Sequence, residues 1–137
     1  MQYIASCRLN NNLLVLFFMA EYNEKLEDLV DHYLIDNEEL EKRTEGGGVG
    51  YLINGNMCLG VYEDFLVTRI GEQLARSLID RPGIRKYLPD DGLYDDFIMI
   101  EEKIYNHSKA LHKFIDKSIA YTESLPQKDH GKSDIDF

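Results

Sequence analysis

The chain has 137 residues and a formal net charge of −10, with 44% hydrophobic and 29% charged residues. This length and composition indicate one folded domain and argue against a globally disordered chain. A protein that binds DNA by itself usually presents a basic face. The acidic balance therefore argues against direct nucleic-acid binding and against docking to anionic membranes.

The N-terminal segment has an apolar run at residues 13–20 after a polar, mixed start. A membrane-spanning helix needs about 20 apolar residues, so this run is too short to cross a bilayer. An export signal is disfavoured because Arg8 is the only basic residue before the run and Glu21 follows it. We interpret residues 1–18 as an N-terminal extension, and translation starting at Met19 is one explanation of it.

Two cysteines, Cys7 and Cys58, lie far apart in the sequence and form no CxxC motif. Cytosolic proteins keep such thiols reduced, so we interpret the chain as cytoplasmic with free cysteines. A disulfide between Cys7 and Cys58 is the alternative.

The first half of the chain predicts a helix followed by strands. Apolar residues recur with helical spacing in residues 20–35, acidic residues occupy the other side, and Asn23 is a candidate cap. Residues 37–45 are charged and are interpreted as a connector. Three strand-like runs follow at residues 49–53, 57–62 and 65–70, and their short connections predict an antiparallel meander.

The second half predicts a helix at residues 71–80, strands at 84–88 and 97–100, and a last helix at 106–125 that ends before Pro126. Residues 129–137 are expected to form a disordered tail. The order is therefore α-β-β-β-α-β-β-α, which predicts an α+β two-layer sandwich with an antiparallel sheet.

Few residues suggest chemistry. Cys58, in the stretch NGNMCLGV, has no histidine nearby in sequence and is interpreted as a packed, inert residue rather than a nucleophile. His107 and His112 are five residues apart, which does not suit a metal pair on one helix face. The run Gly46-Gly47-Gly48 precedes a strand and has no adjacent lysine, unlike a phosphate loop. We therefore expect no metal and no cofactor.

A polar binding face is the remaining site hypothesis. Arg69 lies within an otherwise apolar strand, where it either points outward on a wet sheet face or marks a binding surface. In the second case we expect it to act with Asn54, Asn56 and Thr68.

Several short motifs occur in a fixed order along the chain. They are Gly47-Gly48, YLINGNM at 51–57, Gly60-Val61, FLVTRIG at 65–71, RPGIR at 81–85 and Leu125-Pro126. In this set the chain resembles the N-terminal domain of the TfoX/Sxy family over residues 19–128. The resemblance implies a secretion-chaperone-like sheet fold and a role in controlling competence and DNA-uptake genes.

Full-length members of that family carry a further, C-terminal helical domain, so the resemblance implies a stand-alone N-terminal domain here. The chain also departs from the family at two places. It has Glu45-Gly46 where relatives have Met-Phe, and its residues 92–97 are acidic where relatives have a basic loop. These departures put in doubt any anion contact that the loop makes in relatives.

The sequence thus predicts a non-enzymatic regulatory or protein-interaction domain. We expect its protein partner to bind the sheet face, a sheet edge or the acidic helix at residues 20–35. Homodimerisation through an open sheet edge is a further expectation. The alternative is a small-molecule or nucleotide-handling enzyme with a cleft between the sheet and the last helix.

Overall fold

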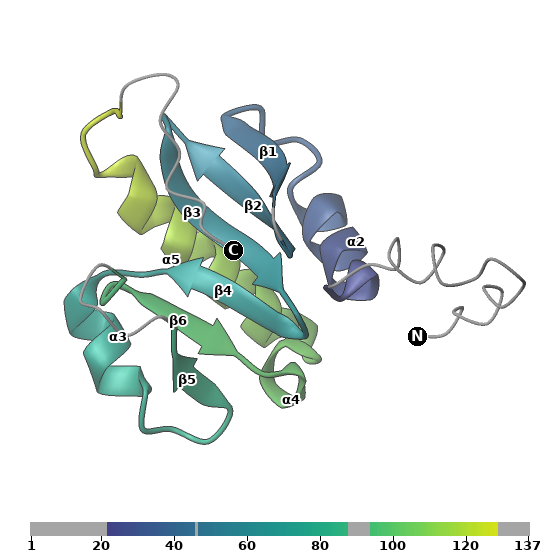
Figure 1. The fold of residues 1–137 in the computed structure, drawn as a ribbon, viewed down its shortest axis with the longest axis vertical. Coiled ribbons are helices and arrows are strands. Elements are labelled where there is room, and N and C mark those ends of the chain that lie inside the picture. The colour runs from purple at the N-terminus through teal and green to yellow at the C-terminus, as the bar shows by residue number, and fades with distance from the viewer. Residues whose placement is uncertain (1–21, 46, 88–93, 129–137) are drawn as a thin grey trace, which may run out of the picture.

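The computed structural model describes residues 22–45, 47–87 and 94–128 (Figure 1). The expectations for residues 1–18 and 129–137 lie outside this described part. The elements in chain order are α2 Glu24–Tyr33, β1 Leu40–Glu45, β2 Gly48–Ile53, β3 Asn56–Tyr62, β4 Phe65–Arg69, α3 Glu72–Leu78, β5 Ile84–Lys86, β6 Phe97–Ile100, α4 Glu102–Tyr105 and α5 Ser108–Glu123. The predicted α+β class is confirmed.

The six strands form one sheet in the order β1-β2-β3-β4-β6-β5, and every neighbouring pair is antiparallel. Strands β1 to β4 follow the chain as a meander, whereas β6 inserts between β4 and β5. The hairpin between β2 and β3 turns at Asn54 and Gly55, whose φ angles are 53° and 81°. Positive φ at both positions is typical of the tight turn that Asn-Gly favours, so this predicted hairpin is confirmed.

One face of the sheet is covered by helices. Helix α5 lies across this face and contacts β2, β3 and β4 (Figure 1). Helix α2 packs beside it through Leu26 and Val30, which are buried in the same core. The start of α2 is set by Asn23, whose side-chain oxygen accepts a hydrogen bond from the Leu26 N–H at 2.9 Å. The main core therefore lies between the helices and this helix-covered face.

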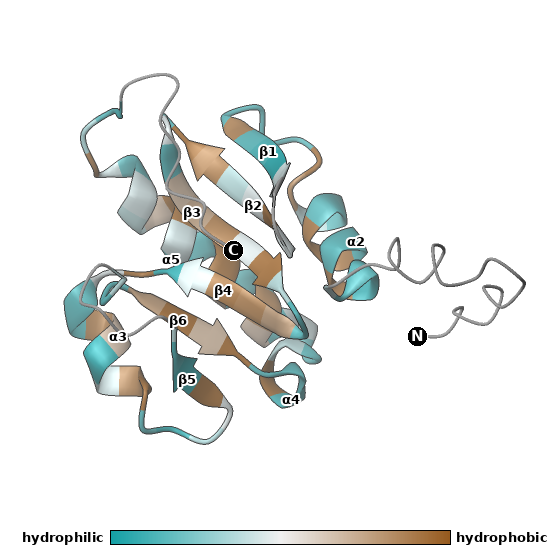
Figure 2. Ribbon diagram, viewed as in Figure 1, coloured by the Kyte–Doolittle hydropathy of each residue, from teal (hydrophilic) through white to brown (hydrophobic). Residues whose placement is uncertain are grey.

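The opposite face of the sheet carries a smaller apolar cluster. Paired residues on neighbouring strands share a face, and Leu52 pairs with Met57 while Val67 pairs with Met99. All four are buried, together with Phe97, and none belongs to the main core. Figure 2 shows hydrophobic residues along β3, β4 and β6. The sheet is thus apolar on both faces.

The structure has one strand more than the predicted order. Residues 37–45 were expected to form a connector, but Leu40–Glu45 is the edge strand β1. Its sequence, LEKRTE, is charged because it lies at the border of the sheet, where solvent reaches one side. Strand β1 ends at Glu45 and β2 begins at Gly48, so the last glycine of the predicted run opens a strand that follows another strand.

The last predicted helix is also divided differently. It was expected at residues 106–125, but a short helix, α4, precedes it and α5 begins at Ser108. Asn106 and His107 separate the two, and the His107 carbonyl oxygen accepts a hydrogen bond from the Leu111 N–H at 3.0 Å. Among the described residues, no helix combines the length and apolar character needed to cross a membrane.

Candidate interaction surface

The two asparagines of the predicted binding face hold the segment that follows α5. The Asn56 side chain donates to the Pro126 carbonyl oxygen at 2.9 Å, and the Lys128 N–H donates to the Asn54 carbonyl oxygen at 2.8 Å. A Cβ atom on Gly55 would lie 3.0 Å from Lys128, so only glycine fits this close approach comfortably. These contacts give both asparagines a structural role, and their role in binding stays a prediction.

Thr68 and Arg69 lie on opposite faces of the sheet. Thr68 is fully buried on the helix-covered face. Arg69 extends over the opposite face, with its guanidinium 5.1 Å from the centre of the Phe97 ring. Its Nε donates to Asp96 at 2.8 Å, and its Nη1 donates to the Met57 carbonyl oxygen at 3.2 Å. The structure therefore brings Arg69 to Asp96 rather than to Thr68.

Asp96 connects three elements, although by sequence it is only one acid of the loop at residues 92–97. Its carboxylate accepts hydrogen bonds from Arg69 and, at 3.3 Å, from the Tyr121 hydroxyl on α5. Its carbonyl oxygen accepts from the N–H groups of Ile70 and Gly71. Burial and the nearby Asp96 carboxylate raise the pKa of the Tyr121 hydroxyl. One feature of the sequence could have pointed to this contact. Asp96 directly precedes a predicted strand, and that strand pairs with the strand that carries Arg69.

Cys58 is packed on the helix-covered face, as predicted. Its side chain is fully buried and its thiol is free. Burial raises the pKa of the thiol to about 12, while the Thr122 hydroxyl and Arg69 act in the opposite direction. Because the thiolate is the reactive form, a thiol with this pKa is a poor nucleophile at neutral pH.

His112 and Asp116 contact helix α2. The His112 ring stacks on the Tyr33 ring with the centroids 3.9 Å apart, and the Tyr33 hydroxyl donates to Asp116 at 2.9 Å. This hydrogen bond raises the pKa of the Tyr33 hydroxyl. His112 and Asp116, four residues apart on α5, thus both hold this helix beside α2. No group of three metal-ligating side chains occurs in the described part of the chain.

Helix α2 and the residues just after it expose apolar side chains. Leu29 is 50% exposed and Ile35 is 75% exposed, and they are the exposed large hydrophobic residues of the described chain. The exposed acids Glu24 and Asp28 lie on the same helix. Leucine and isoleucine side chains gain free energy when a partner covers them. This surface, which we call the α2 surface, combines those apolar side chains with two exposed acids and the exposed Lys25.

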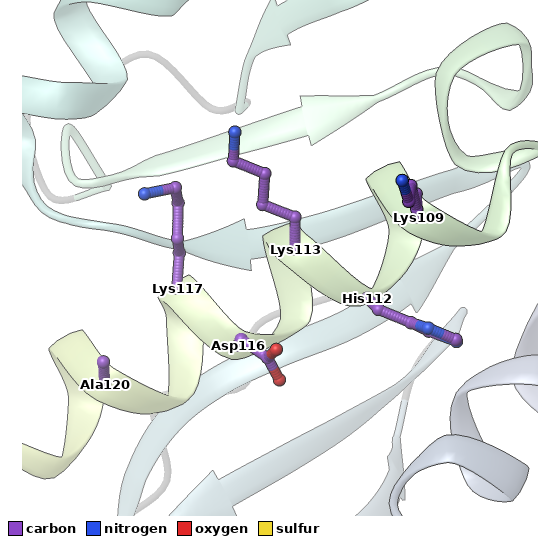
Figure 3. A pocket seen from close by; sticks show the side chains of 6 residues that line it. All are labelled: Lys109, His112, Lys113, Asp116, Lys117 and Ala120. Atoms are coloured by element: carbon purple, nitrogen blue, oxygen red, sulfur yellow. The ribbon is translucent and has the colours of Figure 1, made fainter.

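Helix α5 exposes a row of lysines (Figure 3). Lys109, Lys113 and Lys117 follow one another at intervals of four residues, which places them on one side of the helix. We call them the lysine ridge. They border an open hollow of about 480 Å³ that Ala120 also lines. Asp116 lines the same hollow, so the outer surface of α5 carries an excess of basic side chains, whereas that of α2 carries an excess of acidic ones.

Comparisons with protein families, with curated proteins and with solved structures find no match for this chain. The likeness to the TfoX/Sxy N-terminal domain therefore rests on the sequence motifs alone. A function for the chain has consequently to be inferred from the geometry of its described residues.

Proposed function

We propose that this chain is a non-enzymatic protein-interaction domain that binds its partner through the α2 surface. The observation that carries the proposal is the exposure of Leu29 on α2 and of Ile35 just after it. The exposed acids Glu24 and Asp28 lie on the same helix as Leu29. Exposed apolar side chains that are surrounded by charged residues are typical of sites that a protein partner covers. The partner is expected to present an apolar patch bordered by basic residues.

The packing of α5 supports the same proposal over the enzyme alternative. That alternative needs a cleft between the sheet and the last helix. Leu111, Ile115, Ser118 and Thr122 are buried there, against the sheet. The open hollow of about 550 Å³ that Tyr121 lines is bordered on its other sides by Ile70, Gly71 and helix α3. Cys58, also buried on that face, has a raised pKa that disfavours nucleophilic chemistry.

The cellular setting is proposed from the resemblance to the TfoX/Sxy family. We propose a cytoplasmic regulatory protein, acting on a protein partner in the control of competence and DNA-uptake genes. This setting requires no contact between the chain and DNA, in keeping with its net charge of −10.

The test is a comparison of surface variants. The full chain is used to capture partners from the native cell, and each captured protein is then purified and its affinity measured directly. We expect Leu29→Asp and Ile35→Asp to weaken binding by tenfold or more, on the order of 1.4 kcal/mol. The control is Gln73→Asp, which adds the same charge at an exposed position of α3. Equal affinity of all variants would refute the α2 surface as the binding site.

A further inference from the structure

The exposed helical layer has two halves whose excess charge differs in sign. The exposed acids Glu24 and Asp28 outnumber Lys25 on α2, and the three lysines outnumber Asp116 along the hollow of α5. On α2, Glu24 and Asp28 are exposed, and on α5 the lysine ridge is exposed. Among the described residues, none of these five side chains forms a salt bridge within the chain. Each half therefore offers charge to a partner of the opposite sign.

The two halves repeat their charges at the same interval. Glu24 and Asp28 are four residues apart, and so are Lys113 and Lys117. Four residues of a helix extend about 6 Å along its axis. The two acids of one α2 can therefore meet two lysines of another chain's α5 at the same time.

The two halves also lie side by side in one layer. The stacked rings of Tyr33 and His112 fix α2 next to α5. A two-fold axis passing close to this contact places α2 of each copy over α5 of the other. Such an interface is isologous, so the same charge contacts form twice.

We propose that the chain forms a two-fold dimer in which the α2 surface of each copy docks on the lysine ridge of the other. Leu29 of one copy enters the hollow of about 480 Å³ on the second copy's α5. The aliphatic stems of the lysines and Ala120 provide its apolar lining, and His112 and Asp116 line it as well. This inference rests on the proposed function, because it names the partner of the α2 surface as a second copy of the chain.

A second copy fits these observations better than a nucleic acid does. Phosphates would neutralise the lysine ridge but would leave Leu29 exposed and the acids of α2 unpaired. A second copy covers the lysine ridge, Leu29 and the acids of α2 in one contact.

The decisive experiment is a charge swap on the full chain. One variant carries Glu24→Lys and Asp28→Lys, and the other carries Lys113→Glu and Lys117→Glu. Sedimentation velocity at low salt should show wild-type particles of twice the 15.9 kDa chain mass. Each variant alone should dimerise at least about tenfold more weakly, because its two facing helices then carry like charges.

A mixture of the two variants should restore the dimer. One variant is acidic on both helices and the other is basic on both, so only the mixed pair brings opposite charges together. Added salt should weaken the wild-type and the mixed dimers alike. The control pair Arg76→Glu and Arg81→Glu, exposed and outside α2 and α5, should dimerise like wild type. Circular dichroism confirms that each variant is folded.

Three results would overturn the inference. The wild-type chain could remain monomeric up to about 1 mM, a concentration at which even a weak dimer with a binding free energy near −4 kcal/mol forms. The dimer could persist in both variants, as expected for pairing at a sheet edge. Lastly, duplex DNA could bind to the wild type and not to the Lys113→Glu, Lys117→Glu variant, which would assign the ridge to nucleic acid.

The proposed function fails by a different measurement. If the chain is monomeric while Leu29→Asp still abolishes binding of a captured, purified protein, the proposed function stands and only the second-copy assignment is wrong. If the chain dimerises without sensitivity to Leu29→Asp and no captured protein depends on that residue, both are wrong.

Discussion

The two faces of the sheet are buried in different ways. The helix-covered face is the larger core and packs against α2 and α5. On the opposite face, no described helix covers Leu52, Met57 and Val67, yet these side chains are as buried as those of the main core. There the aromatic rings of Tyr62, Phe65 and Tyr94 pack against them.

This difference between the two faces shows how an antiparallel sheet can be apolar on both sides. A sheet with one wet face shows alternating polar and apolar residues along its strands. In β2 and β6 every residue is buried, so no alternation is present. The wet face expected around Arg69 is instead an apolar cluster, with the arginine lying over Phe97 at its border.

The helix-covered face should be the more sensitive to truncation. Ile115 is fully buried between α5 and the sheet, so Ile115→Ala is expected to lower the free energy of unfolding by about 3–5 kcal/mol. Chemical denaturation followed by circular dichroism measures this loss. Ile119→Ala, on the same helix but only partly buried, is the control and should cost clearly less. A loss for Ile115→Ala no larger than that for Ile119→Ala would contradict the deeper burial of Ile115.

The opposite face should respond less but still markedly. Leu52 is fully buried on this face. Leu52→Ala is expected to lower the free energy of unfolding by about 2–3 kcal/mol, because no described helix covers this face and neighbouring side chains can relax into the cavity left by the substitution. The same denaturation experiment measures it. A loss below about 0.5 kcal/mol, as at ordinary surface positions, would mean that this cluster is exposed in solution.

The smallest of the three effects is expected at the border of the opposite face. Arg69→Gln removes the hydrogen bond and ion pair to Asp96. The Arg69 side chain is only 17% exposed and that of Asp96 only 15%. We expect a loss of about 1–2 kcal/mol, since a mostly buried carboxylate loses its charged partner. A double-mutant cycle with Asp96→Asn isolates the pair's own contribution.

Arg76→Gln is the matched control for this pair. Arg76 contacts Glu72 one helical turn away, on the exposed side of α3. Its loss should change the stability by less than about 0.5 kcal/mol. A coupling of zero between Arg69 and Asp96 would contradict the structural role assigned to Asp96.

Local patterns predicted much of this fold. The Asn-Gly turn is found where expected because both residues tolerate positive φ in any context. Helix α2 begins after Asn23, since an asparagine oxygen can accept the free N–H groups of the first turn. The strand at Phe97–Ile100 is also where predicted, because its apolar, β-prone run is bounded by charged residues.

The candidate sites were less predictable. Strand β1 was missed because its sequence is charged, and it becomes a strand only by pairing with β2. Thr68 and Arg69 are adjacent in sequence, so a strand places them on opposite faces. The lysine ridge was not singled out, although its four-residue spacing was visible, because a solvated helix face shows the same pattern.

By itself, the sequence determined the elements whose signals are local: the hairpin, the capped helix and the apolar runs. Tertiary structure alone decided that both faces of the sheet are buried, that Asp96 meets Arg69 and Tyr121, and that α2 lies beside α5. The physical reason is that turns and caps depend on neighbouring residues. Contacts between residues 20 or more apart depend instead on strand order and helix docking, which no short sequence window contains.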